Sequence, residues 1–551
     1  MRQLVGLGVL GAAAFAGLMA ALAFASSLTS SRGEHIGAVD FDRKAISVAL
    51  WFEPPQLDST RTQDVTSSTI LEHVMEGLLR YDVHRNLVPG VAERWDIRPD
   101  GATFWLRHDA LWSDGRPVTA HDFVFAWRTA VEPQTASPYA FLLYAVKNGE
   151  AVNSGKMPPE ALGVRAVDDR TLEVEFENPI AYFDKLAVFA TYYPVREDFY
   201  RSMHGSYGAD ADKLLYNGPF MITSWVHGAS LRLQKNPHYW DRDSVKLETV
   251  DFAYITTDLN AQLNLYRNGD IASVERLTPD ALDQALNERW PLGHFSDGSI
   301  WYLALNHRPG RVTSNYHFRK ALQLVNDNPE LVNKVLRMPS YTPADSIFPS
   351  WIKGEHGYFL KEHPPPPVVH DAAAARKELE TARRELGLSS FPPLVILCDD
   401  SPLASKTAEY YQNLYMRTLG LRVRIDKQIF KQRLAKSLAG DFDLIVEGWS
   451  PDYDDALTFG DLFSSWNLNN HGKYVNPKLD EQVRIAQRSL DPAVRMAAFA
   501  EIQRILIDDV AIIVNYERGQ LYVQDPHLKG VTHNAIGAER AYTHAYLVAN
   551  P

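Results

Sequence analysis

Cysteine is almost missing from this sequence. Cys398 is the only cysteine among 551 residues. A single thiol excludes a disulfide within the chain, and it excludes a zinc or iron–sulfur site built from several cysteines of one chain. The function of the protein therefore rests on groups other than thiols.

The sequence is also short of positive charge. It has 56 Lys and Arg residues against 68 Asp and Glu residues, which gives a net charge of −12, and no basic run exceeds three residues. A protein that binds nucleic acid needs clustered basic side chains to neutralise phosphates. We therefore expect no nucleic-acid partner. The acidic balance indicates solubility and says nothing about a small ligand.

The common motifs of metal, phosphate and nucleophile chemistry are missing as well. There is no H-E-x-x-H pair, no G-x-x-x-x-G-K-[ST] loop and no G-x-S-x-G elbow, and the 18 His residues show no metal-ligand spacing. We expect no metal, no cofactor, no catalytic residue and no enzymatic activity. One alternative stays open: a secreted hydrolase with a pair of acids in an aromatic cleft, because 68 acidic residues allow many pairs.

Hydrophobic residues, by contrast, are present at the level of globular proteins. They make up 45% of the chain, and the 12 Trp, 25 Tyr and 24 Phe residues suit a large core or a ligand-enclosing interior. At roughly 100–200 residues per domain, the length predicts about three domains.

The N-terminus has the pattern of an export signal. Arg2 precedes an uncharged run from Leu4 to Phe24, which ends in the small-x-small site Ala23-Phe24-Ala25. This pattern predicts a signal peptide over residues 1–26 and a periplasmic protein. The run exceeds the usual apolar stretch of about 7–15 residues, so an uncleaved inner-membrane anchor remains an alternative. No Cys follows the run, which excludes a lipid anchor.

Two halves of the chain differ in their patterns. In the first half, turn residues separate Trp95 from the strand 103–107, and Thr119 is placed to cap a helix over 123–131. Four consecutive prolines at 364–367 mark a break in composition.

The second half alternates strands and helices. A buried strand at 394–397 precedes a helix over 404–419 that Gly420 ends, and Asn476-Pro477 and Asp491-Pro492 predict the starts of two more helices. This order predicts a mixed α/β lobe near residues 300–513.

Several segments together resemble one family. They are Glu76–Leu79, Pro89–Trp95, Trp112–Phe123, Thr135–Tyr139, Asn217–Phe220, Asn236–Trp240, Tyr266–Asp270 and Gly448–Tyr453. In this order, over roughly residues 45 to 545, the chain resembles the extracytoplasmic solute-binding proteins of peptide ABC transporters, the family 5 group of oligopeptide- and dipeptide-binding proteins. One departure is Asn326-Asp327-Asn328-Pro329, where many relatives have Asp-Arg.

The resemblance implies an α/β fold with two lobes that close like a clamshell and an additional α+β domain inserted in the first lobe. The implied divisions are lobe I at 40–75, 198–299 and 514–551, the additional domain at 76–197, and lobe II at 300–513. It also implies a monomer that binds oligopeptides in the periplasm and delivers them to an ABC importer permease by hinge closure. A receptor of the same fold for a non-peptide solute or a sensor system is the alternative.

The resemblance also implies a ligand site. A receptor for peptides of any sequence must pair with the peptide backbone and neutralise its α-ammonium group. Asp452 matches the family position that takes the amino terminus, and Trp449 is expected to wall the first side-chain pocket. The other expected ligand-binding residues are Ser450, Asn217, Gly218, Tyr139, Val65, Trp301 and Tyr302, the last two with hinge packing as an equal alternative. No basic residue matches a site for the peptide carboxylate.

Overall fold

The structure is a computed structural model, and it describes residues 37–62 and 64–551. The predicted signal peptide, residues 1–26, lies outside the described residues. In the part of the chain that is described, no helix combines the length and the apolar character needed to cross a membrane.

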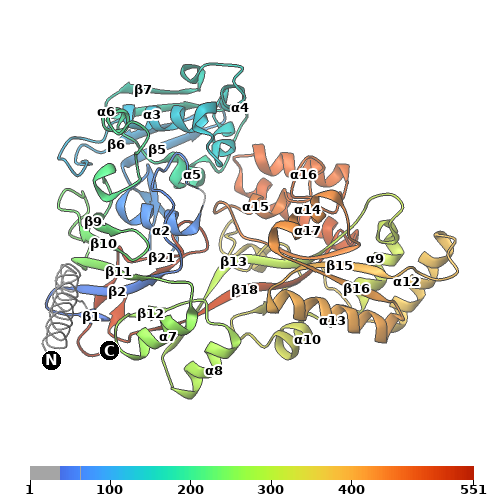
Figure 1. The fold of residues 1–551 in the computed structure, drawn as a ribbon. Helices are drawn as coiled ribbons and strands as arrows, with labels where there is room; N and C mark the ends of the chain where they lie inside the picture. The colour runs from blue at the N-terminus through green and yellow to red at the C-terminus, as the bar shows by residue number, and fades with distance from the viewer. Residues whose placement is uncertain (1–36, 63) are drawn as a thin grey trace, which may run out of the picture.

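The first lobe is built on a five-stranded sheet. Its strand order is β1 (Val39–Asp40), β2 (Ala45–Leu50), β11 (Thr249–Ile255), β10 (Ser230–Lys235) and β9 (Phe220–Val226). Every residue of β2 is buried, because β2 pairs with β1 on one edge and runs parallel to β11 on the other. Helices α2 (Val65–Val74), α7 (Leu259–Arg267) and α8 (Pro279–Asn287) also belong to this part of the chain (Figure 1).

Helix α2 runs from Val65 to Val74. The Asp64 carboxylate caps it by accepting the Ser67 N–H at 2.8 Å. The helix ends at Val74, since the chain then becomes extended and its next residues form β3 (Leu79–Tyr81) with β4 (Leu87–Pro89). This change of direction places the residues after Val74 beside the candidate site described below.

An additional α+β domain sits on the first lobe. It has a four-stranded antiparallel sheet in the order β5 (Ala92–Arg98), β6 (Gly101–Leu106), β8 (Thr171–Glu175) and β7 (Val164–Asp168). Helix α3 (Ala120–Val131) packs on this sheet, and the short helices α4 (Gly149–Asn153), α5 (Phe183–Leu186) and α6 (Glu197–Ser202) complete it (Figure 1).

The predicted hairpin and helix of this domain are confirmed. β5 and β6 form the hairpin, and Thr119 is the N-cap residue of α3. The Asp122 carboxylate accepts the Thr119 N–H at 2.9 Å and the Trp112 indole N–H at 3.1 Å. The motif that contributes to the family resemblance therefore has a structural role here, because it fixes the start of α3.

The second lobe is built on a seven-stranded sheet. The strand order is β12 (Ser273–Val274), β18 (Ile512–Gln524), β13 (Leu292–Leu305), β17 (Leu444–Trp449), β15 (Leu394–Asp399) and β16 (Val423–Gln428), with β14 (Thr342–Pro343) paired to β18. β15 runs parallel to β16 and β17, as the alternating pattern of the sequence indicates.

Helices cover both faces of this sheet (Figure 1). One core contains residues of α9 (Tyr316–Leu324), α12 (Ala372–Glu385) and α13 (Pro402–Leu419), and it also holds the free thiol of Cys398. The opposite core contains residues of α15 (Leu457–Gly460), α16 (Pro477–Arg488) and α17 (Pro492–Asp508), and α14 (Phe430–Ala439) lies nearby. Gly420, at φ +69°, ends α13, and Asn476 and Asp491 cap α16 and α17, as predicted.

The unusual segment 326–329 leads into unusual helix geometry. α10 (Asn328–Glu330) is followed directly by a π-helical turn over Leu331–Leu336. The Asn328 amide donates to the carbonyl oxygens of Ala344 (2.8 Å) and Val514 (3.1 Å). This side chain therefore ties the start of the turn to β18.

Two long strands join the lobes. The boundary expected at 299/300 falls inside β13, and the one expected at 513/514 falls inside β18, so neither marks a break in the chain's structure. After β18, the short strands β19 (Leu528–Lys529), β20 (Thr532–His533), β21 (Arg540–Ala541) and β22 (Tyr546–Leu547) follow, and Leu528, Tyr542 and Ala545 are buried in the first-lobe core. The chain thus passes between the lobes along β13 and β18 (Figure 1).

Candidate ligand-binding site

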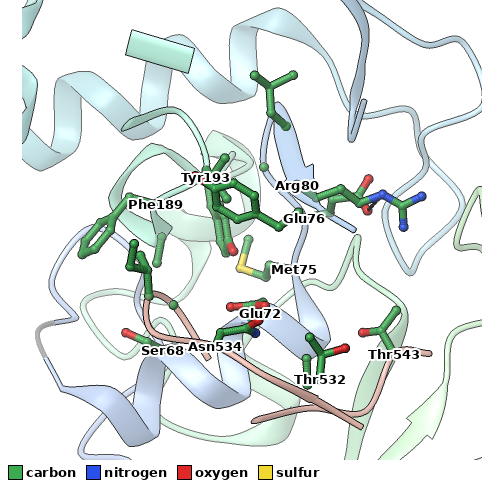
Figure 2. A pocket seen from close by; sticks show the side chains of 18 of the residues that line it. Ser68, Glu72, Met75, Glu76, Arg80, Phe189, Tyr193, Thr532, Asn534 and Thr543 are labelled. Atoms are coloured by element: carbon green, nitrogen blue, oxygen red, sulfur yellow. Dashed lines mark ion pairs between the residues drawn. The ribbon is translucent and has the colours of Figure 1, made fainter. Parts of the chain in front are cut away.

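A cavity lies where five parts of the chain meet. They are the end of α2 with the segment after it, the segment around α5, the first-lobe residues Pro219 and Tyr239, the loop after β17, and the C-terminal segment 532–544. The cavity has a volume of about 100 Å³ and opens to solvent. Figure 2 shows the side chains of Glu72, Met75 and Tyr193 close together, with Phe189 farther out. Both lobes and the additional domain therefore contribute to one cavity.

Asp452 lines this cavity from the second lobe. β17 ends at Trp449, and the Thr458 hydroxyl oxygen then accepts both the Asp452 N–H (3.1 Å) and the Trp449 indole N–H (3.2 Å). Burial raises the pKa of the Asp452 carboxyl to about 6. Within residues 37–62 and 64–551, no Lys, Arg or His forms an ion pair with it. A buried carboxylate without a cation is the partner that a ligand ammonium group requires.

A second carboxylate lies behind Asp452. Burial raises the pKa of Asp461 to about 7, and the negative charge of Asp452 adds to the shift. The Asp461 carboxylate accepts a hydrogen bond from the Asn467 amide at 3.3 Å. Asp461 does not line the cavity.

Asp455, three residues further on, is fully neutralised by the protein. Arg495 binds it through two nitrogen atoms at 2.6 and 2.9 Å, and Lys185 of α5 binds it at 2.9 Å. Burial opposes ionisation of Asp455, but the two cations outweigh burial and hold its pKa well below the usual value. Next to this group, Tyr453 stacks on Tyr182 with ring centroids 5.1 Å apart. These contacts join the additional domain to the second lobe beside the cavity.

Trp449 and Ser450 flank Asp452 in sequence. Trp449 is half-buried and packs on the core beneath α15 to α17, while Ser450 is exposed. Neither residue lines the cavity in this arrangement of the lobes. Their contact with a ligand stays a prediction.

Asn217 and Gly218 serve the protein's own backbone. The Asn217 amide is buried; it accepts the Glu76 N–H at 3.0 Å and donates to the Glu76 carbonyl oxygen at 2.9 Å. A Cβ on Gly218 would lie 2.5 Å from the Met75 nitrogen, so the glycine is required by close approach to the end of α2. Neither residue lines the cavity, and their contact with a ligand stays a prediction.

Tyr139 and Val65 lie beside two different pockets. Tyr139 packs on Phe189, a cavity residue, with ring centroids 4.9 Å apart, and burial together with the charge of Asp452 raises its pKa. Val65 is 52% exposed and lines a separate hollow beside Arg276 and Arg540. Tyr139 therefore borders the cavity, whereas Val65 does not.

Trp301 and Tyr302 point to opposite faces of β13. Tyr302 is 3% exposed and contacts Phe463 in the core, so packing is the role that its position shows. Trp301 stacks on Tyr516, with the Arg518 guanidinium over its ring at 5.3 Å. Arg518 in turn binds Asp297 at 2.6 Å. Neither aromatic ring lines the cavity.

Glu72, which lines the cavity from α2, is not among the residues expected from the sequence. Its Oε2 accepts the Ala538 N–H at 2.5 Å, and burial raises its pKa to about 7. The neighbouring Glu76 has more partners than Glu72. The Trp240 indole N–H (2.6 Å), the Tyr239 hydroxyl and Arg80 all contact it. The only hint in the sequence is a carboxylate inside the apolar run Ile70-Leu71-Glu72-His73-Val74.

Comparisons with known proteins agree with this architecture. The sequence model of the family described as "Bacterial extracellular solute-binding proteins, family 5 Middle" matches residues 86–470. The "Oligopeptide-binding protein OppA" of Bacillus subtilis is 30% identical over 538 residues, covering 94% of this chain and 95% of the relative.

Solved structures resemble the whole described fold. The substrate-binding domain of an oligopeptide ABC transporter from Bacillus anthracis is 35% identical with a TM-score of 0.72, over 92% of this chain and 99% of that chain. The unliganded open form of the periplasmic murein tripeptide binding protein MppA is 26% identical with a TM-score of 0.79, over 93% and 98%. The chain belongs to family 5 of the bacterial extracellular solute-binding proteins, and its fold is the two-lobed clamshell of that family.

Proposed function

We propose that this protein binds oligopeptides in the bacterial periplasm and delivers them, without catalysis, to the membrane permease of an ABC importer. The observation that carries the proposal is Asp452, a half-buried carboxylate that lines the cavity and has no cationic partner among the described residues. The names of the relatives support a peptide as the ligand, since they are called oligopeptide-binding proteins.

The proposed mechanism uses both lobes. The peptide's α-ammonium group binds Asp452 on the second lobe, and its backbone pairs with protein backbone as an added strand. A ligand that contacts both lobes stabilises the closed form, because the open form lacks half of those contacts. The loop 449–452, with Trp449 and Ser450, moves with Asp452 and forms the wall around the first peptide residue.

The proposed domain divisions follow the strands. We assign 40–75, the residues after the additional domain up to β13, and the segment after β18 to the first lobe, which the core contacts of Leu528 and Tyr542 support. The hinge then comprises β13 and β18. The protein acts as an exported monomer, and an N-terminal segment that stays uncleaved would tether the same receptor to the inner membrane.

The α-ammonium group provides the sharpest test. Isothermal titration of the purified protein with alanine tri-, tetra- and pentapeptides should give saturable binding, and the same peptides with an acetylated amino terminus should bind at least about thirtyfold more weakly. Asp283→Asn, which removes an exposed charge of α8, serves as the control and should leave both affinities unchanged.

Other outcomes of this titration would overturn the proposal. Equal binding of free and acetylated peptides would remove Asp452 as the ammonium site. If no peptide binds, mass spectrometry of the solute released from denatured protein decides between a receptor for a non-peptide solute and a sensor. Release of a chemically altered peptide would instead show a hydrolase.

A further inference from the structure

The cavity is negatively charged beyond what its own cations neutralise. Its lining carboxylates are Glu72, Glu76, Asp82 and Asp452, and its lining cations are Arg80 and Lys185. Arg80 binds Asp241 at 2.8 Å and lies 3.9 Å from Glu76, and Lys185 binds Asp455 at 2.9 Å. Both cations are thus already engaged. Burial lowers the pKa of His544, which therefore adds no positive charge at neutral pH.

Two of the four carboxylates, Glu72 and Asp452, have fewer partners in the protein than the other two. Asp82 accepts the backbone N–H groups of His84 and Asn86, each at 2.8 Å, and Glu76 has the contacts described above. Glu72 has one donor, the Ala538 N–H, and no partner of its Oε1 atom is found in the described part of the chain. Glu72 therefore resembles Asp452: each is a half-buried carboxylate that faces the cavity and that the protein does not neutralise.

Apolar side chains form part of the wall around these carboxylates. Met75, Val188, Phe189, Tyr193 and Ile536 line the same space as the polar Thr532, Asn534 and Thr543, and Figure 2 shows Tyr193 next to Met75 and Glu72, with Phe189 farther out. A side chain that fits such walls and ends at a carboxylate has a long aliphatic stem and a cationic head. Lys and Arg have this construction, because their methylene groups pack on apolar surface while the head stays solvated or paired.

We propose that the cavity selects peptides with Lys or Arg near the amino terminus, whose side-chain cation binds Glu72 on the first lobe while the α-ammonium group binds Asp452 on the second. The assignment rests on the proposed peptide-binding function and adds the class of peptide to it. Because the two carboxylates belong to different lobes, such a peptide links the lobes through two charge pairs, and a neutral peptide provides only one.

Calorimetric titration at pH 7.5 tests the assignment with matched peptides. Lys-Ala-Ala and Ala-Lys-Ala are compared with the same peptides carrying norleucine, which keeps the stem and removes the charge. At one of the two positions, the wild-type protein should bind the Lys peptide at least about tenfold more tightly than the norleucine peptide. In Glu72→Gln, this ratio should fall below about threefold.

A control separates local pairing from overall charge. Glu93→Gln removes the same charge from an exposed position of β5 and should leave the ratio at its wild-type value. A ratio near one in the wild type, with alanine peptides still bound, would overturn the selectivity and leave the peptide function standing. A large ratio that persists in Glu72→Gln would overturn the role of Glu72. Failure of all free peptides to bind would overturn the function itself.

Discussion

Asp452 and Asp455 lie three residues apart on one loop, yet the protein treats their charges in opposite ways. Asp455 is bound by Lys185 and Arg495, and its pKa is held well below the usual value. Asp452 faces the cavity without a cation among the described residues, and burial raises its pKa to about 6. The first arrangement holds the additional domain against the second lobe. The second leaves a charge that a ligand must neutralise.

The largest effect on stability is expected from removing the charge of Asp455, the neutralised aspartate. Asp455→Asn leaves Lys185 and the almost fully buried Arg495 without their carboxylate. Removing one partner of a buried ion pair costs about 3–5 kcal/mol, so we expect a loss of that size in the free energy of unfolding, measured by urea denaturation.

The exposed control for this experiment is Asp243→Asn, whose carboxylate is 97% exposed and 3.7 Å from Arg242. It should change the free energy of unfolding by less than about 0.5 kcal/mol. If Asp455→Asn is equally mild, the contact between the additional domain and the second lobe does not contribute to stability.

Substitution of Asp452, the aspartate that faces the cavity, should change peptide affinity and not stability. Asp452→Ala removes the partner of the buried α-ammonium group and should weaken peptide binding at least about a hundredfold, about 3 kcal/mol. The free protein should be no less stable than wild type, because the lost carboxylate is not compensated in it. Titration calorimetry measures the affinity, and urea denaturation measures the stability. An unchanged dissociation constant would contradict the role of Asp452.

The two aspartates should also differ in their response to pH. Asp452 must be ionised to bind an ammonium group, and its pKa in the free protein is about 6. Peptide affinity should therefore fall about tenfold between pH 7.5 and pH 5, as protons compete for the carboxylate. Asp455 stays ionised over this range, so the contact it makes is retained. Affinities measured across the range check this, and a pH-independent affinity would contradict it.

The sequence predicted the elements of the fold better than the site. Local signals, such as Thr119 before α3 or Gly420 after α13, act within one turn of chain, and the structure confirms them. Asp452 was expected from its motif, and it lines the cavity. Asn217 and Gly218 come from a motif too, but their contacts with Glu76 and Met75 join residues about 140 positions apart, which no local pattern records.

Glu72 could not be found from the sequence for the same reason, its dependence on contacts with distant parts of the chain. Its position opposite the loop of Asp452 depends on how the segment 532–544 returns to the first lobe, since Ala538 supplies its one hydrogen bond across 466 residues. Its charge in an apolar run is visible in the sequence, but whether a cation lies beside it is decided only by the folded chain. Lone and paired carboxylates look alike in a sequence.

The smallest expected effect is that of Glu72→Gln on the stability of the ligand-free protein. Its sign should be opposite to that of Asp455→Asn. Glu72 has a pKa of about 7 in the folded state, above its usual value, so the folded protein binds a proton that the unfolded chain releases between about pH 4.5 and 7. Stability is therefore lost as pH rises through this window. Glu72→Gln removes the uncompensated charge and keeps an acceptor for the Ala538 N–H, so it should raise the free energy of unfolding by at least about 1 kcal/mol more at pH 7.5 than at pH 5. Urea denaturation of both proteins at the two pH values measures this. A destabilised variant at pH 7.5 would mean that the protein itself neutralises Glu72, which would end its likeness to Asp452.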